Sequence, residues 1–208
     1  MSELQITAIE PMTRGRVNIH FENEEALPLY RSEICKLPRK DAELLTEGTC
    51  IPQSLYRKLL YEVIGVRAKK RAVFLLEQMD RTKKQLTDKL MRSGYPRICV
   101  EEAVAYVERY RFLDDERYAR MYVRCKQDKR SRRRIMLDLA AKGVAREVIE
   151  QALDEEYTAD ETEKIRQLLE KRHYDYQGKD QKEKQRTYQY LMRRGFHSSD
   201  ILKALRAQ

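Results

Sequence analysis

From about residue 52 onward, apolar residues recur at every third or fourth position. This spacing places them on one face of an α-helix, so it predicts a helical chain. The first clear example is the segment 53–79. It carries two apolar groups, separated by Gly65, which either divides two helices or weakens one long helix. The groups are Leu55, Leu59 and Val63, then Ala72, Leu75, Leu76 and Met79.

The first 51 residues show a different pattern, in which apolar and polar positions alternate. In RVNIHF (16–21), Val17, Ile19 and Phe21 fall on one face, which is typical of a half-buried strand. Thr-Arg-Gly at 13–15 predicts a turn back to an earlier strand around 6–9, and ALPLY (26–30) can add a third short strand. A small N-terminal β-rich extension is therefore expected at 1–51.

Past residue 80 the chain repeats itself around three glycines: Gly94, Gly143 and Gly195. Each has a leucine four positions before it and an apolar or aromatic residue one position after it. Further apolar residues follow six, nine and ten positions later. The matched residues are Leu90, Leu139 and Leu191; Tyr95, Val144 and Phe196; Val100, Ile149 and Ile201; Ala103, Ala152 and Ala204; Val104, Leu153 and Leu205.

This repeat predicts a helical hairpin, with the glycine in the left-handed conformation just past the end of the first helix. A further helix precedes each hairpin, at about 66–80, 116–127 and 160–173. The chain is therefore expected to be mainly α, with three tandem three-helix repeats in an elongated curved body. The expected boundaries are a linking helix at 52–65 and repeats at 66–111, 112–157 and 158–208.

Four segments together resemble the RecX family of RecA recombinase regulators. In chain order they are RTKKQLTDKLMRSGY, RFLDDERYARMYV, RRRIMLDLAAKGV and YLMRRGF followed by DILKAL. The resemblance covers about residues 68–206. Two departures occur: Ser131 and Arg132 stand where the family often has glycine and proline, and Asp138 stands where glutamate is usual. The first departure affects the expected shape of this loop.

The resemblance implies a regulator that binds the RecA filament on DNA and modulates ATP hydrolysis, strand exchange and the SOS response, with inhibition as the expected direction. It also implies weak binding to single- or double-stranded DNA, and no enzyme activity. No apolar run is long enough to cross a membrane, and MSELQITAIEP does not have the features of a secretory signal. A cytoplasmic protein, monomeric and without cofactors, is therefore expected.

The net charge of +9 is unevenly distributed. Residues 1–64 carry 8 Lys/Arg and 10 Asp/Glu, whereas residues 65–208 carry 35 and 24. An excess of this sign favours a polyanion or an acidic protein surface as partner.

The densest basic run, at residues 126–134, is the first candidate for contact with the filament or DNA. Cations are mildly unfavourable at a helix N-terminus, and with only Asp128 against them they predict an external anion. A solvated helix face is the alternative. Replacing Arg132, Arg133 and Arg134 is expected to leave the melting temperature nearly unchanged. The candidates in this run are Lys126, Lys129, Arg130, Arg132, Arg133 and Arg134.

Three further basic groups are candidates for the same contact. Arg193 and Arg194 fall in the last helical turn before Gly195, and Lys142 holds a matching place in the second repeat. Basic residues also complement the carbonyl end of a helix, so a structural role is equally open for them. The last cluster, Lys69, Lys70 and Arg71, falls on the helix expected at 66–80.

Several residues that could suggest catalysis or metal binding have simpler explanations. Asp114 and Asp115 occupy the N-cap and first turn of a helix, so structural capping is expected rather than acid–base chemistry. The four cysteines form no CxxC pair and no ligand spacing with the three histidines, so no metal site is expected. We expect the cysteines to be reduced packing residues. Tyr106, Tyr110, Tyr118 and Tyr122 are expected in the core.

One rival function stays open at this point: an autonomous DNA-binding protein of the helix–turn–helix type. The hairpins and the basic C-terminal region permit it. The second helix of the middle hairpin, however, becomes acidic at its end (AREVIEQALDEE), which disfavours insertion into a DNA groove.

Overall fold

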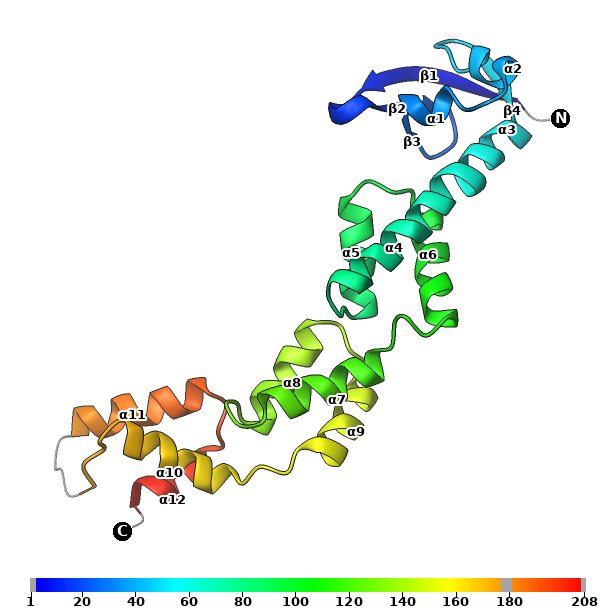
Figure 1. Cartoon of the computed structure of the whole chain (residues 1–208). Coiled ribbons are helices and arrows are strands. Elements are labelled where there is room, and N and C mark those ends of the chain that lie inside the picture. Colours follow the sequence, from blue (N-terminus) through cyan, green and yellow to red (C-terminus); the bar gives the residue numbers. More distant parts are fainter. Residues whose placement is uncertain (1–2, 177–180, 207–208) are drawn as a thin grey trace. The chain divides into compact units, whose positions relative to one another are not determined.

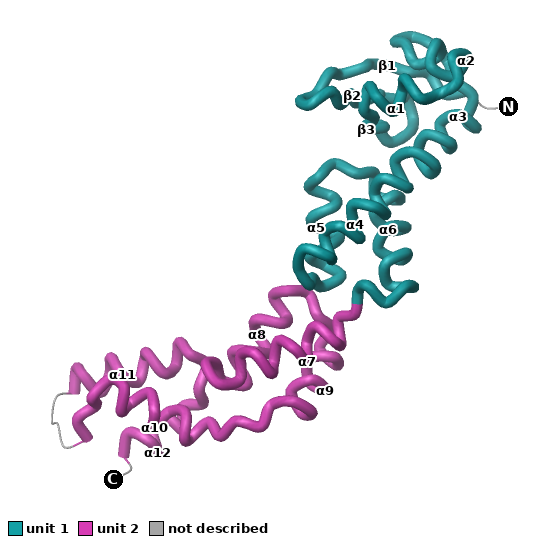
Figure 2. Tube along the Cα trace, in the orientation of Figure 1, with its two compact units in different colours: residues 1–113 teal, residues 114–208 magenta. Residues whose placement is uncertain are grey.

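The computed structural model describes residues 3–176 and 181–206. The protein is mainly helical with a small N-terminal sheet (Figure 1). It divides into two compact units between Leu113 and Asp114 (Figure 2). None of the helices in the described ranges is both long and apolar enough to cross a lipid bilayer.

The sheet contains the three predicted strands and one more. These are β1 (Glu3–Pro11), β2 (Arg16–Phe21), β3 (Leu27–Tyr30) and β4 (Cys50–Pro52), which pair antiparallel in the order β3-β2-β1-β4. The alternation predicted in β2 is confirmed, because Val17, Ile19 and Phe21 are buried. Two short helices, α1 (Arg31–Ile34) and α2 (Arg39–Glu43), lie between β3 and β4.

The sheet shares one hydrophobic core with the helices that follow it, from Ile6 to Leu113. The helical run consists of α3 (Gln53–Lys58), the π-helical segment η2 (Leu59–Gly65) and α4 (Val66–Gln78). Gly65 has φ −60° and ψ −44°, so it continues the helix instead of dividing it. The hairpin α5 (Lys83–Arg92) and α6 (Arg97–Arg109) completes the unit.

The second unit contains two three-helix groups, each with its own hydrophobic cluster. The first consists of α7 (Asp115–Lys126), α8 (Arg132–Ala141) and α9 (Arg146–Glu156). The second consists of α10 (Glu161–Lys171), α11 (Gln181–Arg193) and α12 (Ser198–Arg206). The predicted architecture, a small N-terminal sheet followed along the chain by three three-helix units, is thus confirmed.

The predicted glycine hairpins form as expected. Gly94, Gly143 and Gly195 have φ values of 75°, 83° and 87°. Each glycine N–H donates to the carbonyl three residues back, and the next N–H donates to the leucine carbonyl of the last turn, for example Val144 to Leu139 at 3.2 Å. This is a Schellman motif, in which the leucine and the residue after the glycine also pack together. It explains why those two columns are apolar in all three copies.

Asp114 is the N-cap of α7, and its carboxylate accepts a hydrogen bond from the N–H of Arg117 at 2.9 Å. Asp115 follows in the first turn. The capping role predicted for this pair is therefore confirmed.

Two packing predictions are wrong in part. Tyr106 and Tyr110 are exposed, with their rings 4.8 Å apart, while Tyr118 and Tyr122 are half-buried against the second core. Among the cysteines, only Cys99 is buried; all four are free thiols, and Cys35, Cys50 and Cys125 are exposed. Helical spacing identifies a face, but it does not show how far that face extends into the core.

Candidate contact surface on the second and third repeats

The basic run begins at the N-terminus of α8, where Ser131 acts as the N-cap. Its hydroxyl oxygen accepts a hydrogen bond from the N–H of Arg134 at 3.1 Å, and the residue is fully buried. Serine and threonine are strong N-caps because they satisfy an N–H that the helix leaves unpaired. Ser131, at the position where the sequence departs from the family pattern, therefore fixes the start of α8.

A lysine of the next repeat holds the loop before Ser131 in place. The Lys164 ammonium on α10 donates to the carbonyls of Gln127 and Arg130 and to the Tyr157 hydroxyl, the last at 3.0 Å. Burial lowers the pKa of Lys164. The backbone that carries the basic run is thus held in place by hydrogen bonds.

Three arginines of the run form ion pairs within the protein. This is contrary to the expectation that only Asp128 opposes the positive charge of the run. Arg130 and Arg134 both contact the carboxylate of Asp138, which is largely buried. Arg132 donates to the Leu153 carbonyl at 3.1 Å and to the Asp154 carboxylate at 2.5 Å. The sequence conceals these partners, because they lie on later turns of α8 and on α9. Replacing Arg132, Arg133 and Arg134 together is now expected to lower stability.

The other cations of the run have no carboxylate partner in the described ranges. Arg133 and Lys129 are exposed and Lys126 is half-buried, and the side chains of all three make no ion pair there. These three residues are the part of the run that is available to an external anion. We call them the unpaired triad.

A hydrogen bond joins this region to the end of α11. The Ser131 hydroxyl donates to the Arg194 carbonyl at 3.0 Å, and a Cβ added to Gly195 would lie 3.1 Å from the Arg134 nitrogen. The N-terminus of α8 therefore meets the C-terminus of α11, so opposite ends of two helix dipoles face each other. This arrangement brings Arg193 and Arg194 beside the start of α8, although they are some 60 residues away in sequence.

Arg194 and Lys142 contact aromatic rings. The Arg194 guanidinium lies 4.8 Å from the centroid of Tyr190, and the Lys142 ammonium lies 5.5 Å from that of Tyr122. Burial, followed by the charge of Asp138, raises the pKa of Tyr122. Cation–π contacts position a cation without cancelling its charge. Arg193 is exposed.

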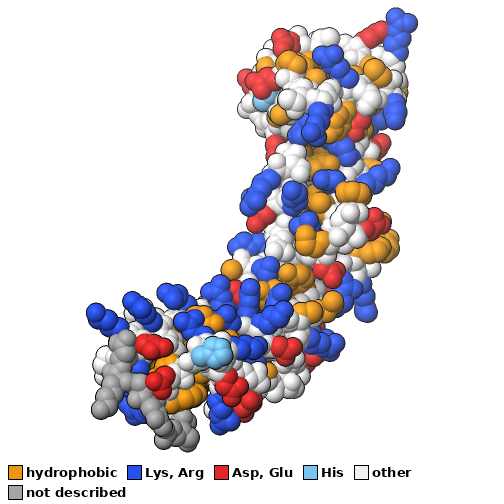
Figure 3. Space-filling view, turned by 60° about the vertical axis from the view of Figure 1, so that its left-hand side comes forward, with side chains coloured by type: hydrophobic (Ala, Val, Ile, Leu, Met, Phe, Trp, Pro, Cys, Tyr) orange, Lys and Arg blue, Asp and Glu red, His pale blue; other side chains and the backbone are white. Residues whose placement is uncertain are grey.

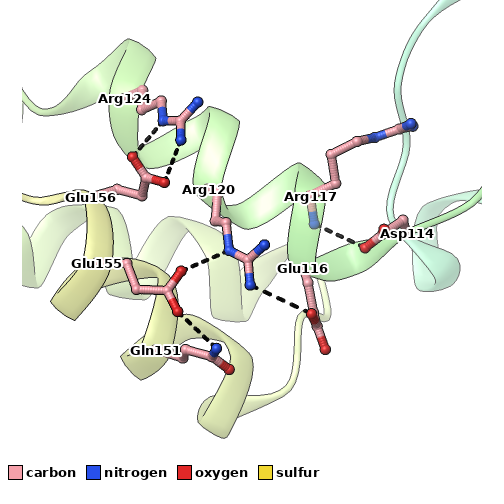
Figure 4. Close-up of polar contacts among 8 residues, drawn as sticks. All are labelled: Asp114, Glu116, Arg117, Arg120, Arg124, Gln151, Glu155 and Glu156. Atoms are coloured by element: carbon pink, nitrogen blue, oxygen red, sulfur yellow. Dashed lines mark hydrogen bonds and ion pairs between the residues drawn. The ribbon is translucent and has the colours of Figure 1, made fainter.

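In a different part of the same unit, arginines also pair with carboxylates of a neighbouring helix. On α7, Arg124 contacts Glu156 of α9 through two nitrogens, and Arg120 reaches Glu155 at 2.8 Å and Glu116 at 3.6 Å (Figure 4). The acidic end of α9, which disfavours groove insertion, therefore pairs with α7. Figure 3 shows Lys and Arg side chains over much of the visible face of this unit.

An open groove of about 580 Å³ lies beside the paired arginines. Arg133 and His197 lie at its edge together with apolar atoms of Met136 and Leu153. The remaining lining residues are Arg132, Glu150, Asp154, Tyr157 and Glu161. The groove thus offers one unpaired cation next to apolar surface, a combination suited to a protein side chain.

The third basic cluster belongs to the first unit. Lys69 pairs with Glu102 at 3.3 Å and lies 6.0 Å from the Tyr106 ring, and the Arg71 guanidinium lies 5.2 Å from the Phe74 ring. Lys70 is exposed. No group of three or more His, Cys, Asp or Glu residues that could hold a metal ion occurs in the described parts of the chain.

Comparison with known proteins identifies the family. Models of the second and third three-helix domains of RecX match residues 114–153 and 159–205. The regulatory protein RecX of Caldanaerobacter subterraneus subsp. tengcongensis is 36% identical over 163 residues, which cover 77% of this chain and 80% of that protein. The chain belongs to the RecX family.

Another RecX protein and two RecX structures also match this chain. The regulatory protein RecX of Clostridium perfringens strain 13 is 27% identical over 203 residues, covering 92% of this chain and 90% of the relative. A crystal structure of regulatory protein RecX has a TM-score of 0.61 at 24% identity and covers 97% of this chain and 98% of its own. The RecX structure from Lactobacillus salivarius has a TM-score of 0.57 at 23% identity, covering 68% of this chain and 94% of its own. These two structures support the fold.

Proposed function

We propose that this protein is a non-catalytic cytoplasmic regulator that binds the RecA recombinase filament on DNA and restrains its ATP hydrolysis and strand exchange. Membership of a family of regulatory proteins supports this function. Any effect on ATP hydrolysis then passes through the recombinase, and this protein acts without a cofactor.

The observation that carries the proposal is the unpaired triad of Lys126, Lys129 and Arg133 on a backbone held by Ser131 and Lys164. Cations without internal partners can pair with an external anion and give up no intramolecular contact. The backbone beside them is also held in place, which reduces the entropy lost on binding. A nucleoprotein filament presents both phosphates and acidic side chains to such a surface.

Co-sedimentation with RecA filaments, together with ATP turnover on single-stranded DNA, tests the proposal. The purified protein is expected to sediment with filaments and to lower turnover at stoichiometric amounts. If it does neither, the proposal fails. If it binds duplex DNA with sequence preference and without RecA, the helix–turn–helix alternative takes its place.

A pair of matched variants tests the surface. Lys129→Gln/Arg133→Gln removes two unpaired charges, and we expect filament binding to weaken roughly tenfold, about 1.4 kcal/mol. The control, Arg146→Gln/Arg166→Gln, removes two exposed arginines that pair with Glu150 at 2.7 Å and Glu163 at 3.1 Å. Equal weakening by both pairs would show that only net charge matters, and would rule out this surface as the contact.

A further inference from the structure

A small polar pocket of about 240 Å³ lies between the end of α10 and the first half of α11. It is lined by Arg172, Tyr174, Glu183, Arg186 and Thr187. None of these residues stands out in the sequence. The backbone creates the pocket, because His173 has φ 51° and the Tyr174 N–H then donates to the Leu169 carbonyl at 3.0 Å. This is the same turn as in the glycine hairpins, and it directs the chain back toward α11.

Tyr174 is the most unusual residue that lines the pocket. Tyr174 is 7% exposed, and its hydroxyl oxygen is buried without a hydrogen-bond partner. Buried polar groups normally have a partner, so each exception needs an explanation. Burial, followed by the charge of Glu183, raises the pKa of this tyrosine, so the hydroxyl keeps its proton. It is therefore a donor without an acceptor.

The two guanidinium groups of the pocket lack carboxylate partners among the described residues. Arg172 lies with its Cζ 4.4 Å from the centroid of Tyr190, the ring that Arg194 also contacts. Arg186 is exposed and makes no ion pair there. Elsewhere in the same unit, Arg124 and Arg132 are held by carboxylates. An aromatic ring fixes a guanidinium without neutralising it, so its N–H donors stay available.

Glu183 also lines the pocket, and its negative charge repels an anion there. It is exposed at the edge of the pocket and, although three residues from Arg186, it forms no ion pair with it in the described structure. With Glu183 ionised, the two arginines still leave the pocket with a positive charge. A neutral residue at 183 would strengthen anion binding.

We propose that this pocket binds a phosphate group, namely a backbone phosphodiester of single-stranded DNA. The inference rests on the proposed function, in which the protein meets DNA within the filament. Two guanidinium groups can donate in forks, and Tyr174 and Thr187, which carry hydroxyl groups, line the same cavity. Donors from several directions fit the oxygens of a tetrahedral anion better than the two coplanar oxygens of a carboxylate.

Fluorescence anisotropy of a labelled single-stranded oligonucleotide, titrated at several salt concentrations, tests the pocket in the full-length protein. Arg186→Gln is expected to weaken binding about fivefold and to reduce the slope of log affinity against log salt by about 0.7, the loss of one phosphate contact. Tyr174→Phe, which removes only the buried hydroxyl, is expected to weaken binding two- to fivefold. Glu183→Gln is expected to strengthen it.

Arg166→Gln is the matched control. It removes an arginine from α10 that is paired with Glu163 at 3.1 Å, and is expected to change the affinity less than twofold. Circular dichroism checks that each variant melts as the unaltered protein does. If Arg186→Gln and Arg166→Gln weaken binding equally, or if Tyr174→Phe has no effect, the pocket is not a phosphate site.

Two probes identify the source of the anion. The affinity for an oligonucleotide with uncharged methylphosphonate linkages is expected not to depend on Arg186. A poly-glutamate peptide whose binding depends on Arg186 would overturn the assignment in favour of a protein partner. Co-sedimentation of the unaltered protein with RecA filaments tests the proposed function separately. If the protein binds filaments but Arg186→Gln does not change its affinity for DNA, only the assignment of the pocket is refuted.

Discussion

The hairpin ends of the first and third repeats share one backbone conformation, yet different groups pack against their glycines. At Gly94, in the first unit, the neighbour is the Arg16 side chain from β2. Its guanidinium donates to the carbonyls of Ser93 and Gly94 at 2.9 and 2.8 Å. At Gly195, in the second unit, the neighbours are the Ser131 hydroxyl and the backbone of Arg134.

This difference shows that the same hairpin turn can be attached to the rest of its unit in two ways. In the first unit a long side chain satisfies the carbonyl end of α5 and ties the sheet to the hairpin. In the second unit the start of α8 packs directly against the end of α11, and the side chain of its N-cap, Ser131, joins the two repeats. A flexible side chain can move away from an added methyl group, whereas a helix N-terminus is held by its own hydrogen bonds.

The comparison predicts that Gly195→Ala is more damaging than Gly94→Ala. The left-handed conformation costs a non-glycine residue about 1–2 kcal/mol. The added Cβ would also lie 2.6 Å from the Ser131 Oγ and 3.1 Å from the Arg134 nitrogen, and overpacking of this kind costs about 1–3 kcal/mol. We expect a total loss of about 2–5 kcal/mol, measured by hydrogen exchange of α8 and α11 amides.

Gly94→Ala is expected to cost less, about 1–2 kcal/mol, because mainly the left-handed conformation is penalised. The Cβ would lie 2.6 Å from an Arg16 terminal nitrogen, which a change of side-chain rotamer can displace. Hydrogen exchange should show the loss in α5 and β2. A cost at Gly94 equal to that at Gly195 would contradict the distinction between the two attachments.

The three hairpins were predictable from the sequence because the Schellman turn fixes a glycine, a leucine and an apolar residue at set spacings. β2 was predictable for a similar reason, since its alternation spans six residues. β4 was missed because three residues, Cys50–Pro52, are too few to show a period. The turn at His173 was also missed, because a histidine replaces the glycine that marks the other three.

The candidate surface was only partly predictable. The sequence located the basic run, but not which of its cations are neutralised. Asp154, which pairs with Arg132, is 22 residues away on another helix, and its position depends on how α9 packs. The junction between Arg194 and Ser131 joins residues 63 apart. Contacts of this kind come from tertiary packing, which local charge patterns do not encode.

The four thiols give a prediction about exposure that separates the core of the first unit, which contains Cys99, from the surface of the protein. Burial raises the pKa of Cys99 to about 12, and its Sγ donates to the Leu60 carbonyl at 3.3 Å. Because the thiolate is the reactive form, iodoacetamide at pH 8 is expected to modify Cys35, Cys50 and Cys125 while Cys99 reacts only after unfolding. Mass spectrometry of the native protein should find three modified cysteines; rapid labelling of Cys99 would contradict its place in the shared core.

The smallest effect expected is the coupling between Ser131 and Gly195, and it tests the junction between α8 and α11 most directly. Ser131→Ala removes the N-cap of α8 and the hydrogen bond to Arg194, at a cost of about 1 kcal/mol. It also removes the oxygen that an added Cβ at position 195 would strike. Gly195→Ala should therefore cost about 1 kcal/mol less in the Ser131→Ala protein than in the unaltered one, since the stability effects of substituting two residues in contact are not additive. Denaturant unfolding of the four proteins measures this coupling. Additive costs would mean that α8 and α11 separate readily, and that Arg193 and Arg194 are not held beside the start of α8.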